Sequence, residues 1–153
     1  LVFNQTSRSQ NIHLKFSFQM NDASEDKVAS RLCQMFEWWN EVIRDNSRIV
    51  RSEFSKFFTD DVIMVINREV RATGIDEIIE RFLSVHHNVD YVEICLPVEK
   101  EFSSGNNIFT SHLVKSRTSN DFNEEHVVGY AEIKDDKIAL INFLSMPVVD
   151  SQP

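Results

Sequence analysis

One segment constrains the fold more than any other part of this chain: it runs from Phe57 to Phe82 and reads FFTDDVIMVINREVRATGIDEIIERF. Asp60-Asp61 predict the end of a preceding helix, and the β-branched run from Val62 to Ile66 predicts a strand. Asn67-Arg68 is typical of a tight turn, after which Glu69 to Ala72 predict a second strand. A helical pattern follows at once, so the segment predicts a hairpin joined directly to a helix.

Helical periodicity predicts three helices. The first begins at Ser24 and runs to about Asn46, because apolar residues recur there at every third or fourth position. A shorter second helix begins near Ser47, and Thr73 or Gly74 caps the third. The residues expected to face inward are Val28, Leu32, Met35, Phe36, Trp39 and Ile43 on the first helix, and Ile75, Ile78, Ile79, Phe82 and Val85 on the third.

After His87-Asn88 the apolar period changes to two, which predicts strands at about 89–99, 107–118, 125–134 and 137–147. Three helices that feed a curved, mainly antiparallel sheet define an α+β roll. A chain of 153 residues with few Gly and Pro is typical of one domain, which we place at residues 20–153. Residues 1–19 form an extension, either an extra strand through the alternating residues 13–18 or a segment foreign to the natural domain.

The order of these elements resembles the NTF2-like superfamily, which includes SnoaL-like proteins, ketosteroid isomerases and limonene epoxide hydrolases. The resemblance covers roughly residues 24–147 and includes the closing piece KDDKIALINFLSMP, which looks like the last hairpin of the family. Arg68 stands where the family commonly has Gly. The resemblance implies a cone-shaped roll, with a pocket between the first helix and the concave face of the sheet.

Hairpin geometry predicts which side chains face that pocket. With a two-residue loop at Asp135-Asp136, Tyr130 lies opposite Ile141, and with a preceding loop centred on Asp121, His112 lies opposite Tyr130. A one-residue slip in the second loop would move His112 to the other face of the sheet. The first register predicts one face that carries Thr110, His112, Val114, Val128, Tyr130, Ile141 and Phe143.

The resemblance implies catalytic roles for His112 and Tyr130. His112 falls where the epoxide hydrolases carry an inward catalytic Arg, and Tyr130 falls near an acid that helps to bind the oxyanion in the isomerases. His112 would act as acid, base or electrophile, and Tyr130 as a hydrogen-bond donor. The alternative is a structural pair in which His112 and Tyr130 satisfy each other's hydrogen bonds.

The other predicted ligand-binding residues are mostly apolar: Trp39, Ile66, Asn67, Val114, Val128, Ile141 and Phe143. Trp39 falls near a pocket Tyr of the isomerases, and core filling is its alternative role. Asn67 matches an Asn that helps to hold the reactive water in the epoxide hydrolases, and an ordinary turn residue is the alternative. The acids of the family are missing, since its catalytic carboxylates fall at or near Ile66, Val114 and Phe143. Glu132 is the best remaining carboxylate candidate.

Composition and motifs exclude several classes of function. A net charge of -8 argues against nucleic-acid binding, which needs clustered Lys and Arg. The apolar runs are too short for a membrane span, and His86-His87 lack the spacing of metal ligands, so we expect no membrane, metal or cofactor. Cys33 and Cys95 do not have CxxC spacing, and the sequence shows no secretory leader. We therefore expect both thiols to be reduced and the protein to be cytoplasmic.

The sequence leaves two functions open. The first is a protein that binds a small hydrophobic molecule, with acid-base isomerase, hydratase or cyclase activity as the chemistry that the resemblance implies. The second is a non-catalytic ligand carrier or a dimeric interaction module, and a nuclear-transport-type adaptor is a remoter option. A homodimer through the outer face of the sheet is expected in either case, because that face would present Phe109, Leu113, Val127, Ile133, Leu140 and Leu144.

Overall fold

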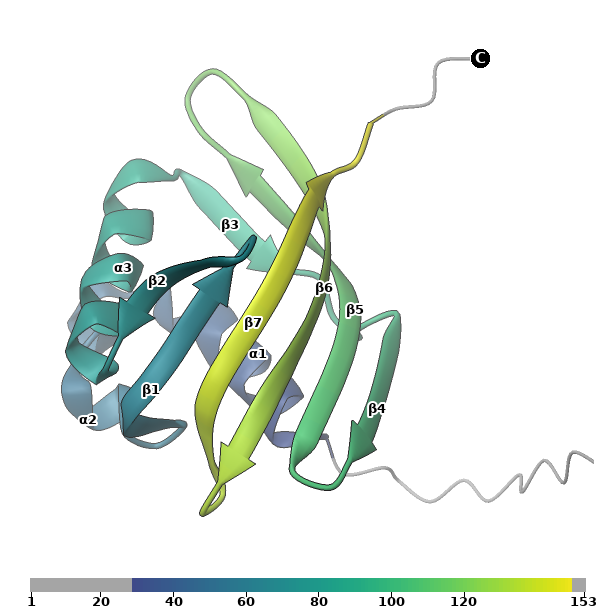
Figure 1. Ribbon diagram of the computed structural model, residues 1–153. Coiled ribbons are helices and arrows are strands. Elements are labelled where there is room, and N and C mark those ends of the chain that lie inside the picture. The colour runs from purple at the N-terminus through teal and green to yellow at the C-terminus, as the bar shows by residue number, and fades with distance from the viewer. Residues whose placement is uncertain (1–28, 150–153) are drawn as a thin grey trace, which may run out of the picture.

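A computed structural model of the protein describes residues 29–149, and it shows a curled sheet around helix α1 (Figure 1). The predicted extension at residues 1–19 lies outside this range. The elements are α1 (Arg31–Val42), the 3-10 turn η1 (Asn46–Arg48), α2 (Arg51–Phe54), β1 (Phe58–Ile66), β2 (Glu69–Thr73), α3 (Ile75–Asn88), β3 (Tyr91–Ile94), β4 (Lys100–Ser104), β5 (Asn107–Arg117), β6 (Phe122–Lys134) and β7 (Lys137–Pro147). The predicted α+β class, with three helices and a mainly antiparallel sheet, is confirmed.

The sheet has the strand order β2-β1-β7-β6-β5-β3, and β4 also pairs with β5. All pairs are antiparallel except β1 with β7, which run parallel. Helix α1 lies across the concave side, while α2 and α3 lie beside β1 and β2 (Figure 1). No helix within residues 29–149 covers the opposite, convex side of the sheet.

The predicted hairpin and helix cap are confirmed in detail. Asn67 and Arg68 have φ values of 51° and 70°, the left-handed conformation that a two-residue hairpin turn requires at both positions. Gly74, with φ 84°, precedes α3, and its amide donates to the Val62 carbonyl at 2.7 Å. The prediction for Asp60-Asp61 is wrong, because both residues lie inside β1, which begins at Phe58.

The first two helices are shorter than predicted within the described residues. Ser30 caps α1, since its hydroxyl oxygen accepts from the amide of Cys33 at 3.2 Å. The predicted start at Ser24 lies outside the described range. The second helix is divided into η1 and the one-turn α2, because the chain turns at Ile49 between them.

The predicted strand at 89–99 is also divided. β3 ends at Ile94, and the next segment contains Pro97, which has no amide proton for a sheet ladder. The next strand, β4, pairs with β5, and the turn at Gly105-Asn106 joins these two strands. Within the described residues, the sheet therefore has one strand more than the sequence predicted.

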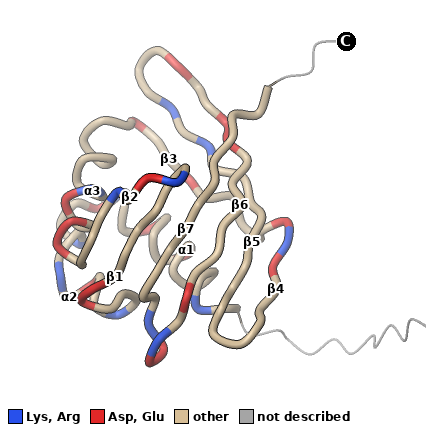
Figure 2. The backbone as a smooth tube through the Cα atoms, in the orientation of Figure 1, with Lys and Arg blue, Asp and Glu red and all other residues tan. Residues whose placement is uncertain are grey.

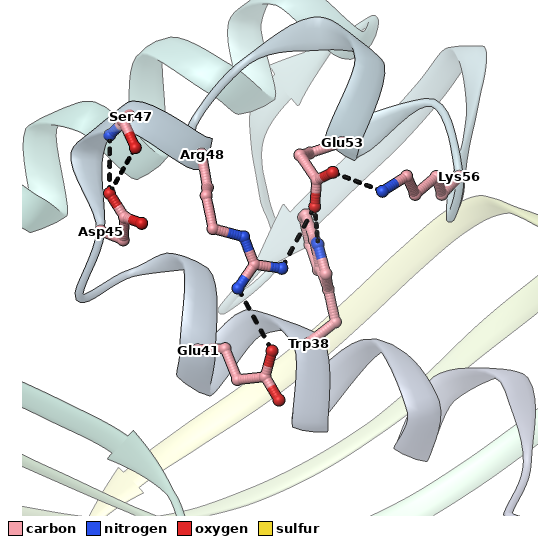
Figure 3. Close-up of polar contacts among 7 residues, drawn as sticks. All are labelled: Trp38, Glu41, Asp45, Ser47, Arg48, Glu53 and Lys56. Carbon is pink, nitrogen blue, oxygen red and sulfur yellow. Dashed lines mark hydrogen bonds and ion pairs between the residues drawn. The ribbon is translucent and has the colours of Figure 1, made fainter.

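Trp38 forms the centre of an aromatic cluster between the helices and β1. Its side chain is buried. The indole Nε1 donates to Glu53 at 3.2 Å, and Arg48 and Lys56 pair with the same carboxylate (Figure 3). These contacts, led by the Lys56 hydrogen bond, lower the pKa of Glu53 to about 2. The rings around Trp38 belong to Phe54, Phe57, Phe58 and Phe82.

Charged residues concentrate on the helices and on the loops at the strand ends (Figure 2). β7 carries only one charged residue, Lys137 at its start. Along the described part of the chain, no helix has both the length and the apolar character to cross a membrane.

Candidate functional site

A cavity of about 360 Å³ lies between α1, α3 and the concave face of the sheet. Its wall is mostly apolar, with a few polar side chains among aliphatic and aromatic ones. The wall consists of Met35, Phe36, Trp39, Phe58, Met64, Ile66, Asn67, Arg81, Phe82, Val85, Val92, Ile94, His112, Val114, Glu125, Val127, Ile141, Phe143 and Ser145. A cavity of this size and lining is typical of a site for a small organic molecule.

The β5–β6 register separates His112 from Tyr130. His112 lies opposite Val127, and Tyr130 lies opposite Phe109. Because adjacent residues of a strand point to opposite faces, His112 faces the cavity and Tyr130 faces the convex side. The predicted pairing of His112 with Tyr130 is therefore wrong. The loop between the strands is shorter than predicted and centred between Ser119 and Asn120 instead of on Asp121, since Arg117 already pairs with Phe122.

The predicted pairing of Tyr130 with Ile141 across β6 and β7 is also wrong. The two-residue loop at Asp135-Asp136 is confirmed, and both residues have positive φ. An irregularity between Glu132 and Ile133 then shifts the pairing, so that Ile141 lies opposite Ala131. The sequence gives no signal for such a bulge, which inserts one unpaired residue and reverses the faces beyond it.

Most of the predicted ligand-binding residues lie on the cavity wall. Six of the seven predicted residues line the cavity: Trp39, Ile66, Asn67, Val114, Ile141 and Phe143. Val128 is the exception, since it lies on the convex face and its residue is 42% exposed. Its neighbour Val127, predicted for the outer face, lines the cavity instead.

His112 is the most deeply buried titratable residue of the cavity, with only 1% of its surface exposed. Its imidazole contacts the rings of Phe36 and Phe143, with centroids 4.7 and 6.0 Å away. No described residue forms a hydrogen bond with Nδ1. Burial, and secondarily the charge of His126, lowers the pKa of His112 to about 4, so the ring is neutral at pH 7.

Gly129 leaves room for the ring of Phe143 on the concave face of the sheet. A Cβ at this position would lie 2.2 Å from one carbon of the Phe143 ring, so the ring occupies the space above the glycine. Gly129 pairs with Phe143 on β7 and with Thr110 on β5. Phe143 is thereby held over the concave face, where it contacts both His112 and Phe36.

Asn67 joins the β1–β2 turn to β7. Its side-chain Oδ1 accepts from the amide of Ser145 at 2.8 Å, and its own amide donates to the Phe143 carbonyl at 2.8 Å. These bonds, with the positive φ, account for Asn67 as a turn residue. The side chain also reaches the cavity wall.

Three polar residues of the wall were missed from the sequence: Arg81, Glu125 and Ser145. Glu125 lies on β6 two positions before Val127, so the correct register would have placed it inward. It pairs with Val114, which makes it a diagonal neighbour of His112 on the concave face. The predicted carboxylate, Glu132, is exposed on the other face.

No group of three or more His, Cys, Asp or Glu residues suited to a metal ion occurs within residues 29–149. His86 Nδ1 lies 2.7 Å from the Ile43 carbonyl, which links α3 to the end of α1. His126 lies on the convex face, where Nε2 is 3.0 Å from a Glu99 carboxylate oxygen. Both histidines therefore have contacts within the protein.

No family model and no curated protein matches the sequence. Solved structures do match the fold. An NTF2-like protein of unknown function from Exiguobacterium sp. 255-15 aligns with a TM-score of 0.62 at 16% identity, over 78% of this chain and 98% of its own. A protein proposed to be a SnoaL-like polyketide cyclase, from Jannaschia sp. CCS1, aligns with a TM-score of 0.60 at 13% identity, over 75% and 82%.

An LEH-like epoxide hydrolase from M. tuberculosis aligns with a TM-score of 0.58 at 13% identity, over 76% of this chain and 83% of its own. At these identities the likeness establishes the fold alone. The chain has the NTF2-like fold, as the sequence resemblance implied. Structures of this fold include a hydrolase and proteins of unknown function, so the fold does not select an activity.

Proposed function

We propose that the protein binds a small, largely apolar molecule in the cavity between α1 and the sheet, with His112 as the central polar contact. The observation that carries the proposal is that Nδ1 of His112, buried in a mostly apolar wall, has no hydrogen-bond partner among residues 29–149. A buried polar atom without a hydrogen bond is unfavourable, and a ligand with one hydrogen-bonding group would satisfy it. The volume of about 360 Å³ equals that of about 12 water molecules in the liquid.

The chemistry best suited to His112 is hydrogen bonding by a neutral imidazole. A pKa of about 4 makes it a poor general base at pH 7, since an effective base has a pKa near the working pH. A neutral imidazole can still donate a hydrogen bond to a carbonyl or epoxide oxygen and polarise it. Isomerase, hydratase or cyclase activity would use His112 in this electrophilic role, with Glu125 as the nearest carboxylate on the same face.

The alternative is a ligand carrier or a dimeric interaction module without chemistry. It is supported by the apolar side chains Ile66, Val114 and Phe143 on the cavity wall, which the sequence resemblance places at or near the catalytic carboxylates of the family. Tyr130 takes no part in either form of the proposal, because it packs against Phe109 on the convex face, with ring centroids 5.6 Å apart.

Binding can be tested with two variants of adjacent residues. Val127→Phe adds a ring to the cavity, whereas Val128→Phe adds the same ring to the convex face. Naphthalene-2-carboxamide, a flat apolar probe with one polar group, should bind the wild type and Val128→Phe but not Val127→Phe. Equal binding to all three proteins would show that the probe does not use the cavity, and the proposal would fail.

Catalysis can be tested separately. Hydrophobic carbonyl compounds, enones and epoxides would be screened for turnover with the wild type and His112→Ala. Turnover that His112→Ala abolishes supports an enzyme. Compounds that bind the wild type without turnover support the carrier.

We also propose a homodimer through the convex face. Val128 and Leu144 pair across β6 and β7 there, and they are 42% and 48% exposed. Further apolar residues on the same face are Phe102, Phe109, Tyr130 and Met146. An apolar surface that spans four strands is typical of a protein interface.

A further inference from the structure

Arg81 is a cation on the cavity wall that forms no ion pair with a described residue. It lies on α3 and lines both the cavity between α1, α3 and the sheet and a second, more open pocket beside Arg71 of β2. Its side chain is half-buried, and no hydrogen bond or ion pair joins its guanidinium to another residue between 29 and 149. The acid one helical turn earlier, Glu77, is engaged elsewhere, because it accepts from the amide of Thr73 at 2.6 Å.

Several other arginines of the described residues do have carboxylate partners. The chain has 24 acidic and 16 basic residues, so carboxylates are in excess. Other arginines form ion pairs, among them Arg48 with Glu53 and Arg71 with Glu69. Burial, and then the like charge of Arg71, lowers the pKa of Arg81. Its environment thus disfavours the cation that it carries, and a bound anion would offset this.

We propose that the ligand of the cavity carries a carboxylate, which pairs with Arg81, and an apolar body, which fills the space toward His112. The planar guanidinium offers two parallel donors that match a carboxylate, and the pair is strengthened by the partly dry wall. Phe82 and Val85, on the same helix, supply the adjacent apolar surface. This inference rests on the proposed function, because it specifies the class of molecule that the cavity takes.

Glu125 restricts how such a ligand can lie. It comes from β6, on the sheet side of the cavity, whereas Arg81 comes from α3. A carboxylate is attracted to Arg81 and repelled by Glu125, so it would lie at the α3 side. The alternative role for Arg81 is a solvated head on an apolar stem that covers the cavity rim, without any ligand contact.

The test compares two probes of nearly equal shape, naphthalene-2-carboxylate and naphthalene-2-carboxamide. Calorimetric titration of the wild type should give carboxylate binding at least roughly tenfold tighter than amide binding, as expected for a charge-assisted pair. Arg81→Gln should abolish this preference, because it weakens carboxylate binding much more than amide binding. The control is Arg71→Gln, which removes a nearby positive charge outside the cavity wall and should keep the preference.

The outcomes separate the two proposals. If the wild type binds the amide as tightly as the carboxylate, or if Arg81→Gln retains the preference, Arg81 is only a solvated rim residue and the inference is wrong. Cavity binding would still stand in that case. If neither probe binds the wild type, the proposed function fails together with the inference. A variant Arg81→Lys, which keeps the charge without the planar fork, should show an intermediate preference.

Discussion

The imidazole of His112 and the phenyl ring of Phe36 lie against each other inside the protein, with their centroids 4.7 Å apart and their planes inclined by 52°. Phe36 comes from α1 and His112 from β5, so this contact joins the helix to the floor of the cavity. An imidazole between apolar rings loses solvation when it becomes charged, and the lowered pKa follows from that burial.

The first prediction concerns pH. The pKa of His112 falls from 6.5 to about 4 on folding, so the unfolded chain binds a proton more readily. Its neutral form supports full stability above about pH 6.5, and stability is lost as the pH falls from 6.5 toward 4. Between pH 7 and pH 5 the loss is roughly 2 kcal/mol.

His112→Leu should remove that part of the pH dependence, because leucine does not titrate. Urea unfolding of both proteins at pH 7 and pH 5 measures the difference, and the remaining histidines are common to both. An equal loss in the wild type and His112→Leu would mean that His112 titrates normally.

The second prediction concerns Gly129. Gly129→Ala should destabilise the fold by about 1–3 kcal/mol, because the new methyl group overlaps the Phe143 ring. In a Phe143→Leu background the same change should be less harmful, since the overlapping ring is gone. A double-mutant cycle by thermal unfolding checks this, and additive effects would contradict the contact.

The third prediction concerns the carboxylate that holds Trp38. Glu53→Gln should lower stability at pH 7 by about 1–2 kcal/mol, because Gln lacks the charge that pairs with Arg48 and Lys56. Glu53 is 19% exposed at its side chain, whereas Glu41, which also contacts Arg48, is 68% exposed. The matched control Glu41→Gln should therefore change stability by less than about 0.5 kcal/mol.

The contribution of Glu53 to stability should also depend on pH. The pKa of Glu53 is lowered from 4.5 to about 2, so its contribution is present above pH 4.5 and is lost as the pH falls toward 2. The difference between the wild type and Glu53→Gln should shrink over this window. A difference that stays constant down to pH 2 would argue against the pairing.

The fourth prediction concerns the convex face. Leu144→Lys should convert a dimer to a monomer, because it places a charge in the centre of the proposed interface. Val149→Lys, at an exposed position after β7, is the control and should leave the dimer intact. Sedimentation at micromolar concentration measures the oligomeric state of both variants. A monomeric wild type would contradict the proposed homodimer.

The hairpin and the order of the elements could be predicted because their signals are local. Asn67-Arg68 and Asp135-Asp136 form two-residue turns with positive φ, and the Asn and Asp residues between two strand patterns indicate such turns directly. The end of the strand at Ile94 was not predicted, although Pro97 indicates an interruption of the sheet ladder.

The faces of the strands could not be predicted with the same success. Their assignment depends on two features without a local signature, the length of the loop before Phe122 and the bulge beside Glu132. Each shift by one residue exchanges the two faces. His112 was placed inward, but Tyr130 and Val128 were assigned to the wrong side and Glu125 was overlooked.

The central claim is that His112 is the polar contact for a small molecule in the cavity. The most direct measurement is the long-range ¹H–¹⁵N spectrum of the histidine rings during titration with naphthalene-2-carboxamide. We predict that the His112 nitrogens shift as the probe saturates, that His86 and His126 do not, and that Val127→Phe abolishes the change. His112 nitrogens that keep their position at saturation would contradict the claim.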